Sequence, residues 1–102
     1  MNDYILLMHT DAPDPQAADD PGRWGNYLAH LRSTGQFDGG SAIGPGERVR
    51  KNQPGQAVTG GPSGFIRVRA ASLQAAKEQF LAGNPVYEAG GTVELRELPR
   101  SQ

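Results

Sequence analysis

The chain has 102 residues, of which 36% are hydrophobic and 21% charged, a composition typical of one globular domain and not of a disordered segment. Its formal net charge of −1 argues against broad electrostatic binding to nucleic acid or to an anionic membrane. The absence of cysteine excludes disulfides, thiolate metal sites and thiol nucleophiles, and it suits a reducing compartment. We therefore expect a cytoplasmic protein, and the sequence predicts neither a cofactor nor a metal site.

Residues 4–9 predict the first strand, and both of its alternating sides are apolar. Tyr4, Leu6 and Met8 fall on one side, and Ile5 and Leu7 fall on the other. A strand covered on both faces shows this pattern, whereas a half-exposed strand alternates apolar with polar residues. The run is far too short to span a membrane, and no basic segment precedes it as in a signal peptide.

The first helix is the clearest periodic signal in the chain. Its apolar stripe consists of Trp24, Tyr27, Leu28 and Leu31. Asp19 or Asp20 can cap its start, and Pro21 suits a first helical turn. Gly35 predicts its end, because glycine readily adopts the left-handed conformation that closes a helix.

A second helix is predicted after Ser72, which can cap it. Its stripe consists of Leu73, Ala76, Lys77 and Phe80, and Gly83 and Pro85 are expected to end it.

The remaining strands are expected at residues 37–43, 65–70 and 92–98, with a short hairpin strand at 47–51 and a loop at 53–64. Gly39 and Gly40 weaken the first of these and permit a bulge or a close backbone approach. The two Gly-Pro turns, Gly44–Gly46 and Gly60–Pro62, lack the following Lys-Ser/Thr and helix that a phosphate loop requires.

The order of elements, β-α-β followed by β-α-β, predicts an α+β ferredoxin-like sandwich. An antiparallel sheet would carry both helices on one face. The opposite face would then expose the second apolar side of the first strand, and such a surface favours association. We expect a symmetric homodimer that packs sheet face against sheet face.

Several segments resemble the YCII-related proteins, and in particular their DGPF branch. The matching stretches are Leu73–Glu78, Asn84–Gly90, Gly91–Leu98, Tyr4–Met8, Trp24 with Tyr27, and Gly39–Gly40. The resemblance covers nearly the whole chain, mostly through residues that build structure. It implies a single YCII-related domain over residues 1–102 and the dimeric α-β barrel arrangement.

The chain departs from that family where the family carries its more telling residues. Gly60-Gly61-Pro62-Ser63 stands where the Asp-Gly-Pro-Phe turn of the branch is expected. Tyr27 takes the place of a first-helix histidine that, in YCII members, pairs with an aspartate as an acid–base dyad. Thr10 or Asp11 takes the place of that aspartate, so the dyad does not carry over directly.

Four polar residues are candidates for a site in a cleft. His9 ends the first strand and could act as a general base, since histidine titrates near neutrality, or it could simply bond to backbone. Tyr27 could act as an acid or stack on a ligand, although its helical spacing also fits core packing. Asp11 and Arg67 are candidates for ligand binding. With only two histidines, His9 and His30, and no metal-ligand spacing, no metal site is predicted.

Arg67 shares a strand face with Arg69, and Arg96 can look the same way. Guanidinium groups on that face could hold a carboxylate or phosphate in a bidentate manner. The alternative is that these arginines form ion pairs across the sheet with Asp38, Glu94 or Glu97.

Two hypotheses about function remain open from the sequence. One is a dimeric module that binds a small anionic or aromatic ligand without reaction. The other is an enzyme of proton abstraction, isomerisation or elimination on a small cyclic or aromatic acid. In the enzyme, Tyr27 would be the acid, His9 the base, and Arg67 the group that holds an anionic substituent.

Overall fold

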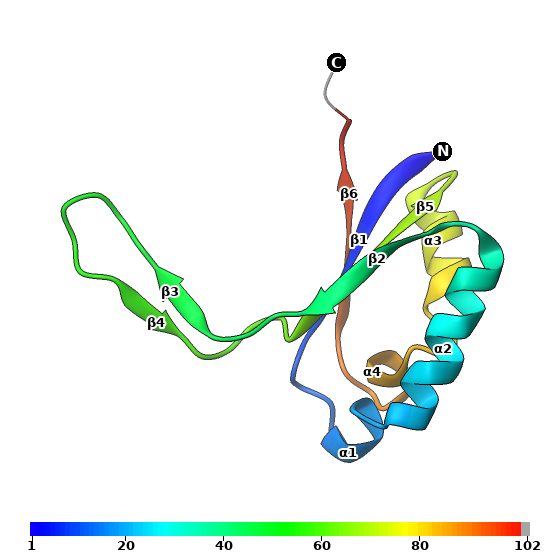
Figure 1. The fold of residues 1–102 in the computed structure, drawn as a ribbon, viewed down its shortest axis with the longest axis horizontal. Coiled ribbons are helices and arrows are strands. Elements are labelled where there is room, and N and C mark those ends of the chain that lie inside the picture. Colours follow the sequence, from blue (N-terminus) through cyan, green and yellow to red (C-terminus); the bar gives the residue numbers. More distant parts are fainter. Residues whose placement is uncertain (101–102) are drawn as a thin grey trace.

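A four-stranded antiparallel sheet with the strand order β2-β5-β1-β6 forms the body of the molecule (Figure 1). The computed structural model describes residues 1–100. The sheet strands are β1 (Asn2–Met8), β2 (Phe37–Ala42), β5 (Gly64–Ala70) and β6 (Val93–Leu98). The helices are α1 (Pro15–Ala18), α2 (Pro21–Thr34), α3 (Leu73–Phe80) and α4 (Pro85–Glu88). This is the predicted ferredoxin-like α+β arrangement, in which the first and third sheet strands lie in the middle.

Local signals set the ends of the two long helices as expected. The Asp20 carboxylate accepts a hydrogen bond from the Arg23 backbone N–H (2.8 Å) at the start of α2. Gly35 closes that helix with a positive φ of 72°, which glycine adopts without steric cost. The Ser72 side chain caps α3 by accepting from the Ala75 N–H.

Several boundaries differ from the predicted ones: β1 begins two residues and ends one residue earlier than expected, β3 ends at Arg48 and not at residue 51, and α1 lies in a predicted loop. Two further differences have a clear physical cause. Pro85 was expected to end a helix, but it stands at the first position of α4, where a missing N–H is harmless. The Asn84 side chain caps α4 by accepting from the N–H groups of Val86 and Tyr87. The loop predicted at 53–64 contains a strand, β4 (Gln56–Val58), which pairs with β3 (Gly46–Arg48). Exposed on both sides, β4 carries no apolar alternation that could reveal it.

The core lies between the sheet and the two long helices. The buried side of β1 contributes Tyr4, Leu6 and Met8, and β5 contributes Ile66, Val68 and Ala70. From the helices come Tyr27, Leu31, Ala76 and Phe80. Each large side chain removed from water here contributes about 1.5–3 kcal/mol to folding. The other side of β1, with Ile5 and Leu7, is only half-buried, so the cover predicted for both faces of this strand is incomplete within one chain.

Gly39 and Gly40 are the site of both a bulge and a close backbone approach, the two features that their sequence permits. Gly39 has a φ of 93°, and the pairing of β2 with β5 shifts register between Phe37 and Gly40. A Cβ at Gly40 would clash with the carbonyl oxygen of Phe65. The two strand backbones therefore approach each other as closely as they do only because residue 40 has no side chain.

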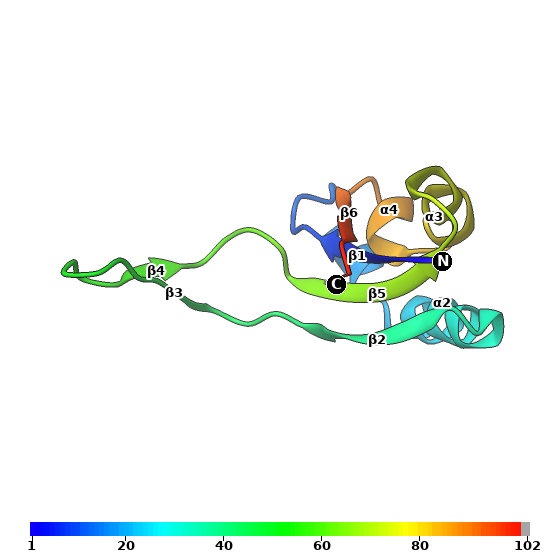
Figure 2. The ribbon, with the colours of Figure 1, turned by 90° about the horizontal axis from the view of Figure 1, so that it is seen from above.

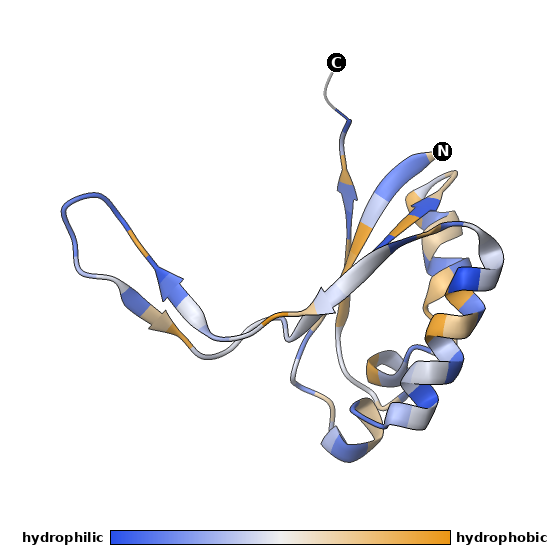
Figure 3. Cartoon of the chain, in the orientation of Figure 1, coloured by the Kyte–Doolittle hydropathy of each residue, from blue (hydrophilic) through white to orange (hydrophobic). Residues whose placement is uncertain are grey.

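A two-stranded arm projects from the end of the sheet where β2 and β5 meet. It consists of β3, β4 and their connections, residues 43–62. Figure 2 shows it running away from the sheet without folding back over the helices. Residues in the arm are mostly hydrophilic, with a few apolar ones interspersed (Figure 3). Within residues 1–100, no helix is long and apolar enough to cross a membrane.

Candidate functional site

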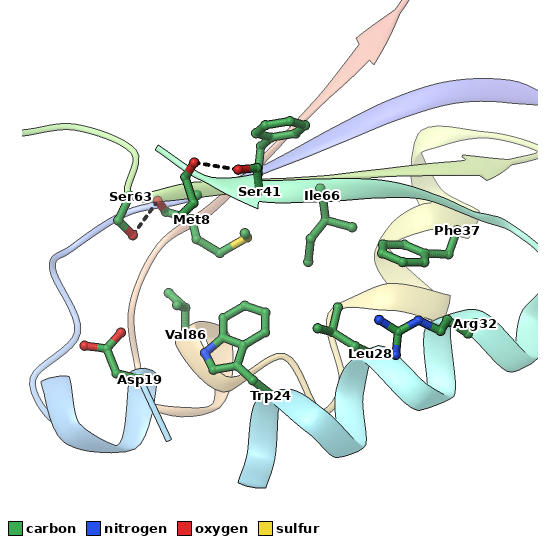
Figure 4. Close-up of a pocket in the computed structure, with 14 residues that line it drawn as sticks. Met8, Asp19, Trp24, Leu28, Arg32, Phe37, Ser41, Ser63, Ile66 and Val86 are labelled. Atoms are coloured by element: carbon green, nitrogen blue, oxygen red, sulfur yellow. Dashed lines mark hydrogen bonds between the residues drawn. The ribbon is translucent and has the colours of Figure 1, made fainter. Parts of the chain in front are cut away.

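A cavity of about 420 Å³ opens between the sheet and α2. Trp24 and Leu28 point into it from the helix, and Met8, Ile66 and Phe37 point into it from the strands (Figure 4). Val86 on α4 closes part of its side. The walls are therefore mainly apolar and aromatic, which is the usual character of small-molecule pockets.

Polar groups stand at the rim of this cavity. Asp19 and Ser63 lie at one end, and Arg32 lies at the other (Figure 4). The Ser63 hydroxyl donates to the carbonyl of Met8 at 3.4 Å. The Arg32 guanidinium lies 6.0 Å from the centroid of the Phe37 ring, and within residues 1–100 it forms no salt bridge. A negative charge and a positive charge thus stand at opposite ends of an apolar space.

The indole of Trp24 is held in place by two contacts. Its Nε1–H donates to the carbonyl of Ala18 at 2.7 Å. Its ring meets Tyr27 edge-on, with centroids 5.7 Å apart and an interplanar angle of 77°. Such an aromatic pair is favourable beyond the area it buries. The indole that lines the cavity is therefore held in position by the protein itself.

The structure places Tyr27 in the core and away from the cavity. Its hydroxyl donates to the carbonyl of Phe80 at 2.6 Å, and the side chain is buried. Burial raises the pKa of Tyr27 above its usual value, which keeps the hydroxyl neutral.

Asp11 ties the loop after β1 to the start of β6. Its two carboxylate oxygens accept from the backbone N–H of Thr92 (2.8 Å) and from the Thr92 hydroxyl (2.6 Å). These hydrogen bonds lower the pKa of Asp11 below its usual value, because they favour the charged form.

His9 and Arg67 lie on the helix-free face of the sheet. The Nε2 atom of His9 is 3.1 Å from Oε1 of Glu94, and the histidine side chain is 26% exposed. Both Arg67 and Arg96 stand opposite Ile5 in the strand register. The four predicted site residues therefore do not converge: His9 and Arg67 share a face, Tyr27 is in the core, and Asp11 bonds to Thr92.

Ion pairs account for two of the three arginines on that face. Arg69 contacts Asp38 at 3.0 Å across the strands β5 and β2, as the alternative interpretation predicted. Arg96 contacts Glu94 at 3.6 Å, but both residues lie on β6, so this pair does not cross the sheet. Arg67 forms no salt bridge within residues 1–100. It is thus the arginine of this face that is free for another anion.

Sequence reasoning missed Arg32 and gave Asp19 another role. Arg32 lies four residues after Leu28 and eight after Trp24, so helical spacing alone puts all three on one side of α2. Asp19 was considered as a helix cap, but Asp20 takes that position and leaves Asp19 at the cavity rim. No sequence pattern predicts that Asp19 and Ser63 lie at the same end of the cavity, because only the folded chain brings these two distant residues together.

A second hollow, also of about 420 Å³, lies between α2 and α4. Arg23, Asn26, His30 and Glu88 line it, together with the ring of Tyr27. The four polar residues are exposed, so this hollow lacks the enclosed apolar wall of the first. No group of three or more potential metal ligands lies together within the described residues.

Among solved structures, the chain is similar to 5-chloro-2-hydroxyhydroquinone dehydrochlorinase from Burkholderia phenoliruptrix, which was determined in complex with 2,5-dihydroxybenzoquinone. The TM-score is 0.59 at 14% identity, and the match covers 99% of this chain and 96% of that one. This likeness supports the fold alone, the ferredoxin-like α+β arrangement described above. No protein-family model and no curated protein sequence matches the chain.

Proposed function

We propose that this protein is a divergent relative of the YCII-related (DGPF) proteins and that it binds a small aromatic ligand in the cavity beneath the sheet. The observation that carries the proposal is the apolar space of about 420 Å³ beside Trp24, with charged groups at its rim. A single aromatic ring with polar substituents suits a space of this kind. The quinone held by the structural neighbour is a molecule of the same class.

The charged groups at the rim favour ligands with particular substituents. A hydroxyl group can donate to the Asp19 carboxylate, and a carboxylate or phenolate can accept from the Arg32 guanidinium. We therefore propose hydroxylated aromatic acids or hydroxyquinones, with the anionic group directed toward Arg32.

Filling the cavity tests this function. Ala42 lines the cavity from β2 and is exposed at its mouth, so Ala42→Trp should occupy the space without removing a core contact. Isothermal titration with a panel of hydroxybenzoates and hydroxyquinones should identify a ligand of the native protein, and Ala42→Trp should weaken its binding by about tenfold or more, the effect of losing roughly 1.4 kcal/mol.

Ala29→Trp is the matched control, because Ala29 is exposed on α2 and outside the cavity. Equal binding by the native protein and the Ala42→Trp variant would contradict the proposal. Arg32→Gln should weaken only the anionic members of the panel, whereas Lys77→Gln, at an exposed position on α3 outside the cavity, should weaken none.

We also propose that two copies associate through the helix-free face of the sheet. Its apolar residues, Ile5, Leu7, Phe65 and Leu98, are only half-buried in one chain. Contact with a second copy would cover them, and a two-fold axis would bring the same surface of both copies together.

An enzyme of proton transfer is the second candidate function, and the His9–Glu94 contact favours it. A carboxylate beside a histidine fixes the orientation of the ring. Arg67 on the same face would hold an anionic substituent. Turnover of a hydroxylated aromatic acid by the native protein, and its loss in His9→Gln, would establish the enzyme. Binding without turnover would contradict the enzyme and support only the ligand-binding module.

A further inference from the structure

The arm lacks the packing that a hairpin needs. β3 and β4 pair only at Gly46–Val58, Glu47–Ala57 and Arg48–Gln56. An isolated two-stranded hairpin is at best marginally stable in water, because it has no apolar face to bury. Every residue from 41 to 57 is exposed, and Val49 retains 74% of its accessible surface. The arm in one copy therefore presents apolar and backbone groups with nothing against them.

The charges of the arm are predominantly positive. Arg48, Arg50 and Lys51 follow one another near its tip, and Glu47 is its single acidic residue. Within residues 1–100 none of these four side chains forms a salt bridge. On a chain whose formal net charge is −1, this cluster stands out from its surroundings.

The segment from Asp11 to Asp20 has the opposite character. It carries four aspartates, Asp11, Asp14, Asp19 and Asp20, and no basic residue. Three of the four are held by hydrogen bonds to Thr92 or to helix N–H groups, which leave their charges in place. Within the described part of the chain, none of them lies within salt-bridge distance of a basic group.

The two charged regions do not meet in one copy. Figure 1 shows α1, inside the acidic segment, below the body, while the arm extends outward from the end of the sheet. The arm also continues away from the body in Figure 2. A second copy would supply the acidic surface that the arm cannot reach on its own chain.

We propose that the arm is a clasp between copies, in which Arg48, Arg50 and Lys51 of one chain dock on the Asp11–Asp20 segment of another. The complementary charge of the two surfaces orients this contact and makes it sensitive to salt. The same contact buries the exposed side chain of Val49. Because Asp19 also lines the cavity, a docked arm covers that end of the cavity.

Site-specific cross-linking tests the clasp, since the chain has no cysteine of its own. Gln53→Cys at the arm tip and Gln16→Cys in the acidic segment leave every charge in place. The two variants are made separately, mixed to allow exchange of copies, and treated with a short bis-maleimide. We expect a cross-linked pair from this mixture. The control mixture, Gln53→Cys with Gln74→Cys on α3, should give little product.

Charge reversal makes the test specific. Arg50→Glu with Lys51→Glu, in the Gln53→Cys chain, should lower the cross-linking yield by about fivefold, the effect of losing two exposed ion pairs. Asp19→Lys in the Gln16→Cys chain changes the charge of the acidic segment from −4 (Asp11, Asp14, Asp19 and Asp20) to −2, so it should lower the yield as well. Equal yields from the Gln16 and Gln74 mixtures, or no response to reversal, would overturn the clasp. Neither result depends on whether the cavity binds a ligand or whether the sheet faces associate.

Discussion

The Tyr27 hydroxyl connects the two long helices. It donates to the carbonyl of Phe80, the last residue of α3, where a helix leaves carbonyl groups without internal partners. Tyr27→Phe would leave that buried carbonyl unpaired, so we expect the free energy of unfolding to fall by about 1–3 kcal/mol. Chemical denaturation at neutral pH would measure it. Tyr87→Phe, with an exposed ring, is the control and should change little.

The same residue makes stability depend on alkaline pH. Burial raises the pKa of Tyr27, so the folded protein retains this proton at a pH where the unfolded chain has lost it. The contribution of Tyr27 to stability is complete below the ordinary tyrosine pKa, and it is lost as the pH rises through the higher pKa of the folded protein. Any role for Tyr27 as a proton donor would have to replace its bond to Phe80.

Asp11 produces the opposite dependence at acid pH. Its pKa is lowered by the two hydrogen bonds from Thr92, so the folded protein releases this proton more readily than the unfolded chain. The contribution is complete above the ordinary aspartate pKa of about 3.9 and is lost as pH falls through the lower folded pKa. We expect Asp11→Asn to melt below the native protein at neutral pH, with a difference that shrinks toward pH 3. Thermal melts across this range would measure it. A difference that stays constant with pH would contradict this account.

At the level of elements, the close approach of β2 to β5 depends on Gly40. Its φ is not in the left-handed region, so the constraint is steric and comes from the backbone of Phe65 and Ile66, above all from the Phe65 carbonyl oxygen. Gly40→Ala should force the strands apart, and we expect it to lower the free energy of unfolding by about 1–3 kcal/mol. Gly44→Ala is the matched control, since a Cβ there meets nothing within 4 Å. Chemical denaturation of both variants would measure the difference, and equal stability would show that the strand can move aside.

Much of the element pattern was predictable because its signals are local. The caps at Asp20, Gly35 and Ser72 depend on a few neighbouring residues, and the apolar stripe of α2 depends on helical period alone. Pro85 was ambiguous because proline both stops one helix and starts another. The strand β4 was missed because a hairpin in solvent has no buried face to give its sequence a period.

The candidate site was less predictable than the fold. Its cavity joins α2, the strands and the segment before the helix, so its lining depends on contacts between residues distant in sequence. Tyr27 is a single-residue example of what the sequence could not predict. Its spacing predicted a side chain facing the core, but a hydroxyl bonded to a carbonyl 53 positions away is a property of the assembled helices.

For the whole molecule, the helix-free sheet face should control association. Leu7 lies near the middle of that face, opposite Phe65 and Glu94. Leu7→Asp would bury two unpaired charges in the proposed dimer, each at a cost of about 3–5 kcal/mol. We expect the dimer dissociation constant to rise by at least about a hundredfold. Sedimentation at micromolar concentration would measure it, with Leu73→Asp on the helix side as control. A native protein that sediments as a monomer would refute the dimer.

The central position of β1 in the sheet also affects how the chain folds during synthesis. This strand is synthesised before both of its neighbours, β5 and β6, which follow it only from Gly64 onward. Until residues 64–98 appear, its apolar sides and backbone groups have no partners. Long-range pairing of this kind slows folding and leaves nascent chains open to aggregation. Ribosome-bound chains that stop before Gly64 should therefore bind chaperones strongly, whereas chains extended beyond Leu98 should release them.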